Sequence, residues 1–175
     1  GETDLGYGGS QHHLLLRTEA GHLYVDAKRG SIFVVSGTGV IPISETGMNK
    51  WFSRNLDFEI AKAFPAVNVD NHFNGIGMTG TWDNLYSRFI ITKLDYSPVA
   101  QYKDGITYDS YYGKFYYNGT EILLEDRKYF CNRSWTLSYN PGTKSWVSFH
   151  SYLPHYYIGL NGLFLAGKNS VFSNT

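Results

Sequence analysis

The chain is poor in the residues that build disulfide frameworks and strongly charged binding surfaces. It has one Cys among 175 residues, so no intrachain disulfide can form, and only 2 Met. Its 15 basic and 15 acidic residues cancel to a formal net charge of +0, which provides no overall attraction to nucleic acid or to an anionic membrane. Because the sequence contains no uninterrupted apolar run of about 18 residues, it predicts no membrane-spanning helix.

Aromatic residues and Gly are abundant instead. Phe, Trp and Tyr make up 17% of the chain, with 15 Tyr and 11 Phe, and there are 19 Gly. This composition favours pleated sheets joined by turns over helix bundles, and the length suffices for one domain with its own core. An all-β fold of antiparallel hairpins is therefore predicted.

A strand-turn-strand pattern occurs twice, at residues 23–35 and 137–149. Each copy has a β-rich arm, then Asp26 or Asn140, then a polar turn with Gly and Lys, and then a second β-rich arm. Asp and Asn side chains bond to the backbone of such turns, and Gly30 and Gly142 are expected to supply the positive φ. Two hairpins of the kind that form propeller blades are predicted.

Between the two copies the pattern changes several times. Helical spacing of apolar residues predicts one short helix near residues 47–56, and residues 65–81 are expected to form an ordered loop. The apolar run at 89–91 indicates a strand buried on both faces. Asn118 and Gly119 are typical of a type I′ hairpin turn. We interpret residues 1–97 as a first blade region, 98–129 as a Tyr-rich hairpin insertion and 130–175 as a second blade region.

The spacing of the two hairpins indicates an incomplete assembly. Asn140 follows Asp26 by 114 residues, whereas one propeller blade takes roughly 40–50 residues and a closed ring needs about four blades or more. This chain would supply only two or three blades. The ends of the sequence, which starts without Met and stops in a strand-like run, predict a segment of a longer polypeptide.

Acidic and His residues offer no convincing catalytic arrangement. Asp70 and His72 stand two positions apart in the predicted loop, with Asn71 and Asn74 nearby, and loop capping by Asp and Asn is the favoured interpretation. Glu121 and Glu125 would share one strand face at about 13 Å, which is too wide for a glycosidase pair. The sequence therefore predicts no enzyme, no catalytic residue, no cofactor and no metal ligand.

Aromatic side chains in and after the insertion are the best candidates for contact with a partner. Tyr buries a large area at low entropic cost, which suits a protein interface, and its ring also stacks on sugars. We favour a protein interface, with a ligand platform as the alternative. The candidates are Tyr108, Tyr111, Tyr112, Tyr116, Tyr117, Trp146 and Tyr152.

Several strings in this order resemble structural tail proteins of crAss-like and related short-tailed bacteriophages, in particular the propeller-containing muzzle or tail-stabilisation protein. They are GYGGSQH (6–12), GHLYVDAKRGSIF (21–33), IS (43–44), GMNKWF (47–52), WDNLYSRFIITK (82–93), SWTLSY (134–139) and WVSFHSY (146–152). Such proteins are much longer, so this chain would match an internal segment.

The resemblance implies a structural component of the distal virion tail. Its partners would be other segments of the same parent polypeptide and neighbouring tail subunits, in a homo-oligomer that closes or lines the DNA channel. Nucleic acid would pass only transiently, and the resemblance implies no catalytic residue. The alternative function is a carbohydrate-binding or receptor-recognition module that uses the Tyr-rich insertion.

Overall fold

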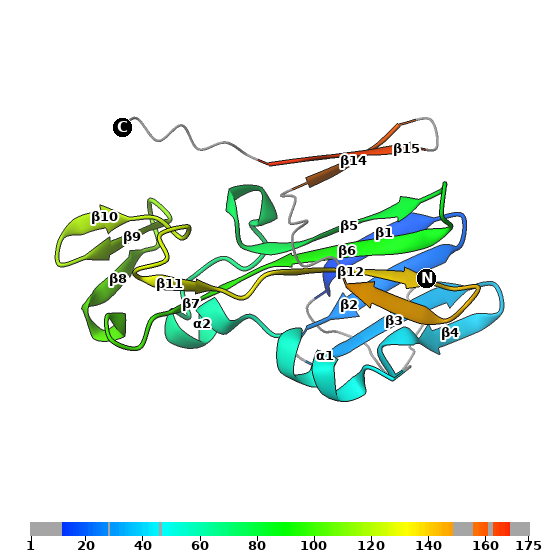
Figure 1. Ribbon diagram of the computed structural model, residues 1–175, viewed down its shortest axis with the longest axis horizontal. Helices are drawn as coiled ribbons and strands as arrows, with labels where there is room; N and C mark the ends of the chain where they lie inside the picture. Colours follow the sequence, from blue (N-terminus) through cyan, green and yellow to red (C-terminus); the bar gives the residue numbers. More distant parts are fainter. Residues whose placement is uncertain (1–11, 28, 46, 149–155, 161–162, 169–175) are drawn as a thin grey trace.

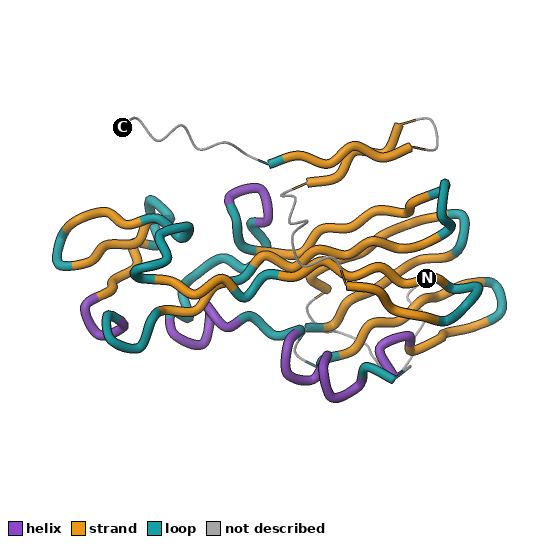
Figure 2. Tube along the Cα trace, in the orientation of Figure 1, coloured by secondary structure: helices purple, strands orange, loops and turns teal. Residues whose placement is uncertain are grey.

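Antiparallel sheets make up most of the protein, as the composition predicts (Figures 1 and 2). The computed structural model describes residues 12–27, 29–45, 47–148, 156–160 and 163–168. Two four-stranded sheets form the main body, and a smaller group of strands extends from one end of it. The all-β prediction is therefore confirmed.

Each four-stranded sheet is an antiparallel meander in which strands follow one another in chain order. The first contains β1 (His12–Thr18), β2 (Gly21–Asp26), β3 (Ser31–Ser36) and β4 (Gly39–Pro42). The second contains β5 (Gly77–Asp83), β6 (Arg88–Leu94), β12 (Trp135–Asn140) and β13 (Ser145–Ser148). In the second sheet a long insertion separates the middle two strands, β6 and β12.

The two sheets bury their apolar faces in one common core. Leu23 and Val25 of β2 belong to the same buried cluster as Ile91 of β6 and Leu137 of β12. Cross-strand pairing places Ile91 opposite Leu137, so these two side chains lie on the same face of the second sheet. The reverse face of β6 is also covered, because Ile90 is only 2% exposed. The prediction of a strand buried on both faces is confirmed.

Short helices lie between the two sheets in the sequence. Helix α1 (Asn49–Asn55) matches the predicted helix near residues 47–56 and buries Phe52. A second helix, α2 (Glu59–Ala63), was not predicted. The expected loop at 65–81 was only partly right, because β5 already begins at Gly77. That strand contains two Gly and no continuous apolar run, and its strand conformation depends on pairing with β6.

The insertion between β6 and β12 forms two small sheets. Strands β7 (Tyr96–Pro98) and β11 (Phe130–Asn132) pair at its base. Beyond them lies a three-stranded sheet, here called the lobe, of β8 (Ile106–Asp109), β9 (Lys114–Tyr117) and β10 (Thr120–Ile122). Positive φ values of 48° at Asn118 and 82° at Gly119 confirm the predicted type I′ turn.

The remaining elements are short. Three 3₁₀ turns occur at Ile43–Glu45, His72–Asn74 and Lys103–Gly105. Strands β14 (Tyr156–Leu160) and β15 (Leu163–Gly167) form a hairpin that lies beside β5 (Figure 1). Within the described ranges, no helix has the length and apolar character needed to cross a membrane.

The two similar hairpins occupy different places in their sheets. The first copy joins the second and third strands, β2 and β3, whereas the second joins the third and fourth, β12 and β13. Asp26 and Asn140 both accept backbone N–H groups of the turn, as predicted. The residue with positive φ differs between the two turns. In the first turn it is Gly30, with a φ of +66°, and in the second it is Lys144, with a φ of +54°, whereas Gly142 does not have a positive φ. The expectation for Gly142 was wrong.

The two turn glycines give a matched test of this difference. A Cβ on Gly30 would lie 2.9 Å from the Ser53 Cα of α1, and the φ is strained for any L side chain. We expect Gly30→Ala to lower the free energy of unfolding by about 2 kcal/mol. Gly142→Ala should cost no more than about 0.5 kcal/mol, because only the half-buried Asn140 side chain, 3.2 Å from the added Cβ, must shift. Urea denaturation of both variants measures this, and equal losses would contradict it.

Candidate functional site

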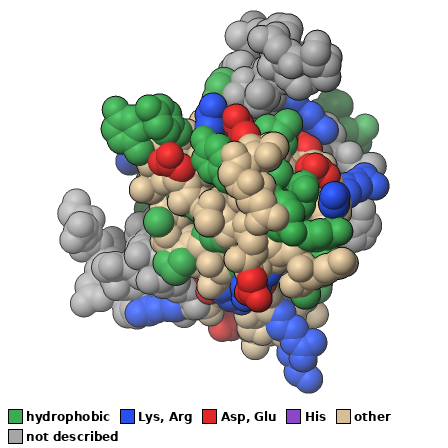
Figure 3. Space-filling view, turned by 90° about the vertical axis from the view of Figure 1, so that its left-hand side faces the viewer, with side chains coloured by type: hydrophobic (Ala, Val, Ile, Leu, Met, Phe, Trp, Pro, Cys, Tyr) green, Lys and Arg blue, Asp and Glu red, His purple; other side chains and the backbone are tan. Residues whose placement is uncertain are grey.

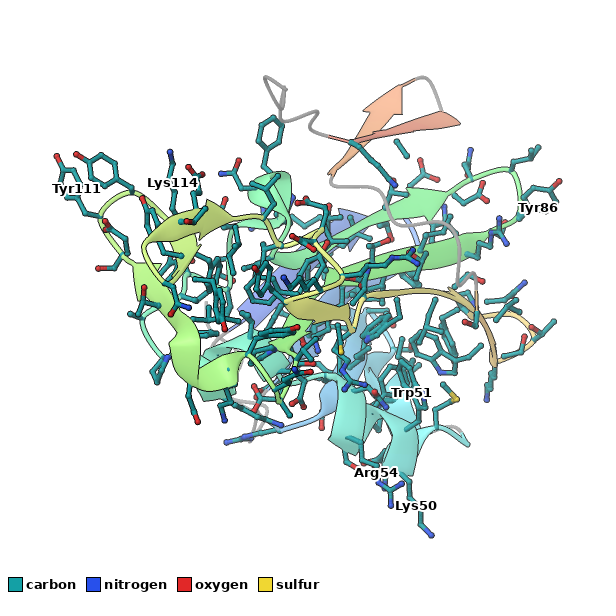
Figure 4. The ribbon with its side chains drawn as sticks, turned by 60° about the vertical axis from the view of Figure 1, so that its left-hand side comes forward. Lys50, Trp51, Arg54, Tyr86, Tyr111 and Lys114 are labelled. Atoms are coloured by element: carbon teal, nitrogen blue, oxygen red, sulfur yellow. The ribbon has the colours of Figure 1, made fainter. Side chains whose placement is uncertain are left out.

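Two of the predicted contact residues protrude from the tip of the lobe. The side chains of Tyr111 and Tyr112 are 86% and 67% exposed, and their rings meet edge to face at 4.8 Å. The turn is held by Asp109, whose Oδ1 accepts the N–H groups of both residues. Figure 4 places Tyr111 and Lys114 at this end, pointing away from the sheets. The turn therefore exposes two aromatic rings on a backbone that the Asp109 side chain holds in place.

Other members of the predicted Tyr cluster pack within the lobe. Tyr108 lies against Phe115 with ring centroids 4.8 Å apart. Tyr117 contacts Tyr129 at 4.9 Å. Tyr116 is half-buried on β9. These side chains build the lobe, so the accessible part of the cluster is its turn. Seen from the lobe end, a group of hydrophobic side chains protrudes beside acidic ones, and further hydrophobic groups lie elsewhere on the same face (Figure 3).

Trp146, the one predicted contact residue outside the insertion that the structure describes, does not join this group. Trp146 of β13 is half-buried, packs against Phe52 at 4.9 Å and donates its Nε1–H to the Ile43 carbonyl at 3.0 Å. It therefore fastens β13 to the segment that leads into α1. Tyr152 lies outside the described residues.

The acidic candidates remain separate. Glu121 on β10 is 3.5 Å from Lys114, while Glu125 follows the strand in a turn. The assumption that both carboxylates lie on one strand was wrong, because β10 ends at Ile122. Asn68 Oδ1 accepts the Asp70 N–H, and His72 begins a 3₁₀ turn, so the side chain that caps this part of the loop is that of Asn68.

A buried ion pair, which the sequence analysis missed, lies under a polar cavity beside α1. Lys93 Nζ is 3.0 Å from Asp95 Oδ2, and the two side chains are 2% and 0% exposed. Lys93 also donates to the carbonyl oxygens of Asn55 and Asp57 at 2.8 and 2.7 Å. The ammonium group thus has three acceptors and ties the link between α1 and α2 to the second sheet.

The carboxylate of Asp95 also has hydrogen-bond partners on both of its oxygens. Its two oxygens accept the N–H groups of Glu59, Ile60 and Tyr96, in addition to the Lys93 ammonium. Burial lowers the pKa of Lys93 below its ordinary value, and the nearby Asp95 charge only partly opposes that effect. A signal for this pair was present in the sequence: two opposite charges, two residues apart, follow the apolar run at 89–91.

The cavity above the ion pair has a volume of about 470 Å³. Its lining residues include the aromatic Trp51 and Trp135 and the cationic Arg54 and Arg133. Trp51 and Trp135 meet edge to face at 5.2 Å, and Trp135 Nε1 donates to the Asn55 carbonyl at 3.2 Å. Figure 4 shows Trp51 and Arg54 on α1, with Lys50 on the same helix.

Neither surface has the composition of a metal centre. In the described part of the chain, no three His, Cys, Asp or Glu side chains are grouped so that they could hold a metal ion. The single Cys131 is exposed and unpaired with another Cys. The two surfaces are suited to contact and binding, through aromatic rings at the lobe and through aromatic rings with cations at the cavity.

The fold and these surfaces define an all-β protein of antiparallel sheets with an aromatic lobe. No family model, no curated protein and no solved structure matches the chain.

Proposed function

We propose that the chain is a structural segment of a phage virion tail, of the muzzle or tail-tip type. It would assemble with other parts of a longer polypeptide and with neighbouring copies around the distal DNA channel. The proposal joins the sequence resemblance to one structural observation, the pair of four-stranded antiparallel meanders that share a core.

The meanders support the proposal because consecutive propeller blades are four-stranded antiparallel sheets packed face to face. Two such sheets are too few to close a ring. Strand β4 ends the first sheet and β13 ends the second, and within the described ranges neither has a hydrogen-bonded strand on its outer side. Ile41 on β4 and Val147 on β13 are 48% and 51% exposed. Open edges with exposed β-branched residues favour completion by other chains.

Quantitative mass spectrometry of purified virions tests the proposal. Peptides from this chain should be present in a fixed ratio to those of other tail components, because a structural segment is incorporated in a set copy number. Capsid peptides serve as the internal control for recovery. If infected cells contain the chain but purified virions do not, the proposed role is wrong.

The alternative function, recognition of a carbohydrate or receptor, is favoured by the protruding pair Tyr111 and Tyr112. Large exposed aromatic rings on a rigid turn are typical of contact sites. We expect Tyr111→Ala and Tyr112→Ala to abolish any binding on a glycan array. Tyr86→Ala is the matched control, since Tyr86 is 63% exposed at the opposite end of the molecule (Figure 4). Binding that survives both lobe substitutions would exclude this site.

A further inference from the structure

The cavity beside α1 carries an excess of positive charge. Its two carboxylates are already engaged, since Glu59 pairs with Lys62 at 2.8 Å and Asp95 pairs with Lys93 at 3.0 Å. The guanidinium groups of Arg54 and Arg133 have no ion-pair partner among the described residues. Arg133 uses only its Nε, which donates to Ser97 Oγ at 3.0 Å. Donors on both arginines therefore remain for a ligand.

Polar groups at the base of the cavity need no ligand. Lys93 has three acceptors, and Ser134 Oγ exchanges hydrogen bonds with the backbone N–H and C=O of Asp95. Trp135 Nε1 is used by the Asn55 carbonyl. A ligand would therefore meet unsatisfied hydrogen-bonding capacity mainly at the two arginines, whose planar forks match the two oxygens of a carboxylate.

Indole surfaces form the apolar part of the wall. Trp51 is half-buried, and its contacts with Phe52 and Trp135, both at 5.2 Å, hold the ring in place. An indole ring has an apolar face, on which the C–H face of a sugar ring packs with little polar loss. The volume of about 470 Å³ lies in the range of small-molecule sites.

We propose that this cavity binds an acidic sugar residue, meaning a six-membered sugar ring that carries a carboxylate. The carboxylate would bind the guanidinium groups of Arg54 and Arg133, and the ring would pack against Trp51. This site is separate from the tyrosine pair of the lobe, and it does not depend on a role in the virion tail.

Calorimetric titration with N-acetylneuraminic acid and with glucuronate, followed also by tryptophan fluorescence, tests the proposal on the full chain. At least one of the two acids should bind, and affinity should fall as NaCl concentration rises. Glucose, which has the ring without the carboxylate, should bind at least tenfold more weakly. Equal binding of glucose would overturn the role of charge. Binding of inorganic phosphate as tight as that of the sugars would overturn the role of the ring.

Charge-removing variants locate the site. Arg54→Gln and Arg133→Gln should each weaken binding about tenfold, because each removes a charge-assisted hydrogen bond. Lys50→Gln is the matched control, because Lys50 is an exposed cation on the same helix that does not line the cavity. Tyr111→Ala should leave binding unchanged. Full affinity in both Arg variants, or no binding of either acid to the unaltered protein, would overturn the proposal.

Discussion

Asp95→Asn should lower the free energy of unfolding by roughly 3–5 kcal/mol. The substitution keeps the size of the side chain but removes the charge opposite Lys93, which is 3.0 Å away and 2% exposed. It also replaces one of two oxygens that together accept three backbone N–H groups. The buried ammonium loses its counter-ion and backbone N–H groups lose an acceptor, and both effects lower the free energy of unfolding. Urea denaturation followed by circular dichroism measures the loss.

The double variant Lys93→Met and Asp95→Asn separates charge from shape. Met is similar to Lys in length but has no charge, so the double variant should be more stable than Asp95→Asn alone. The difference between the single and double variants reports the cost of the isolated ammonium group. A loss below about 1 kcal/mol in Asp95→Asn, with no recovery in the double variant, would show that the pair contributes little to folding.

Phe52→Ala should lower the free energy of unfolding by about 3–5 kcal/mol, because it leaves a cavity in a rigid aromatic cluster. Phe52 is 0% exposed, and its ring lies 5.2 Å from Trp51, 6.4 Å from Trp135 and 4.9 Å from Trp146. It joins α1 to two strands of the second sheet. The loss should appear as a lower urea midpoint and a lower melting temperature.

Phe73→Ala is the matched control, since the same chemical change occurs at a side chain that is 51% exposed. We expect a loss of about 1 kcal/mol or less there, because little cavity can form at a half-exposed position. If the two substitutions cost the same, the aromatic cluster around Phe52 is not the packing centre that its burial indicates.

Local features of this chain could be predicted from the residues alone. Alternation and aromatic content indicated antiparallel strands, and the Asn118–Gly119 pair determined its own turn because both residues adopt positive φ. Helix α1 followed from apolar residues at helical spacing. In the second repeated turn the prediction was wrong, since Lys144 and not Gly142 took the left-handed conformation. The composition of a turn indicates that one residue must adopt positive φ, but it does not always identify that residue.

The sequence alone could not show which of the candidate contact residues are accessible to a partner. Tyr111 and Tyr117 have the same side chain and lie in one short segment, yet Tyr111 is exposed and Tyr117 packs against Tyr129. Their difference arises from position, because Tyr111 is in a turn and Tyr117 is in a strand that faces the base of the lobe. The cavity beside α1 was missed for a related reason: Arg54 and Arg133 are far apart in the chain.

Side-chain chemistry and spacing were enough to specify the all-β class, the short helix and the hairpin turns, because those depend on neighbours within a few residues. Pairing of β6 with β12 across the insertion was decided only in the tertiary structure, and so was the burial of Lys93 against Asp95 beside α1. Such contacts form only when distant segments bury enough apolar surface together to offset the entropy of closing the chain between them. The lobe and the cavity, where we place recognition, are products of that long-range packing.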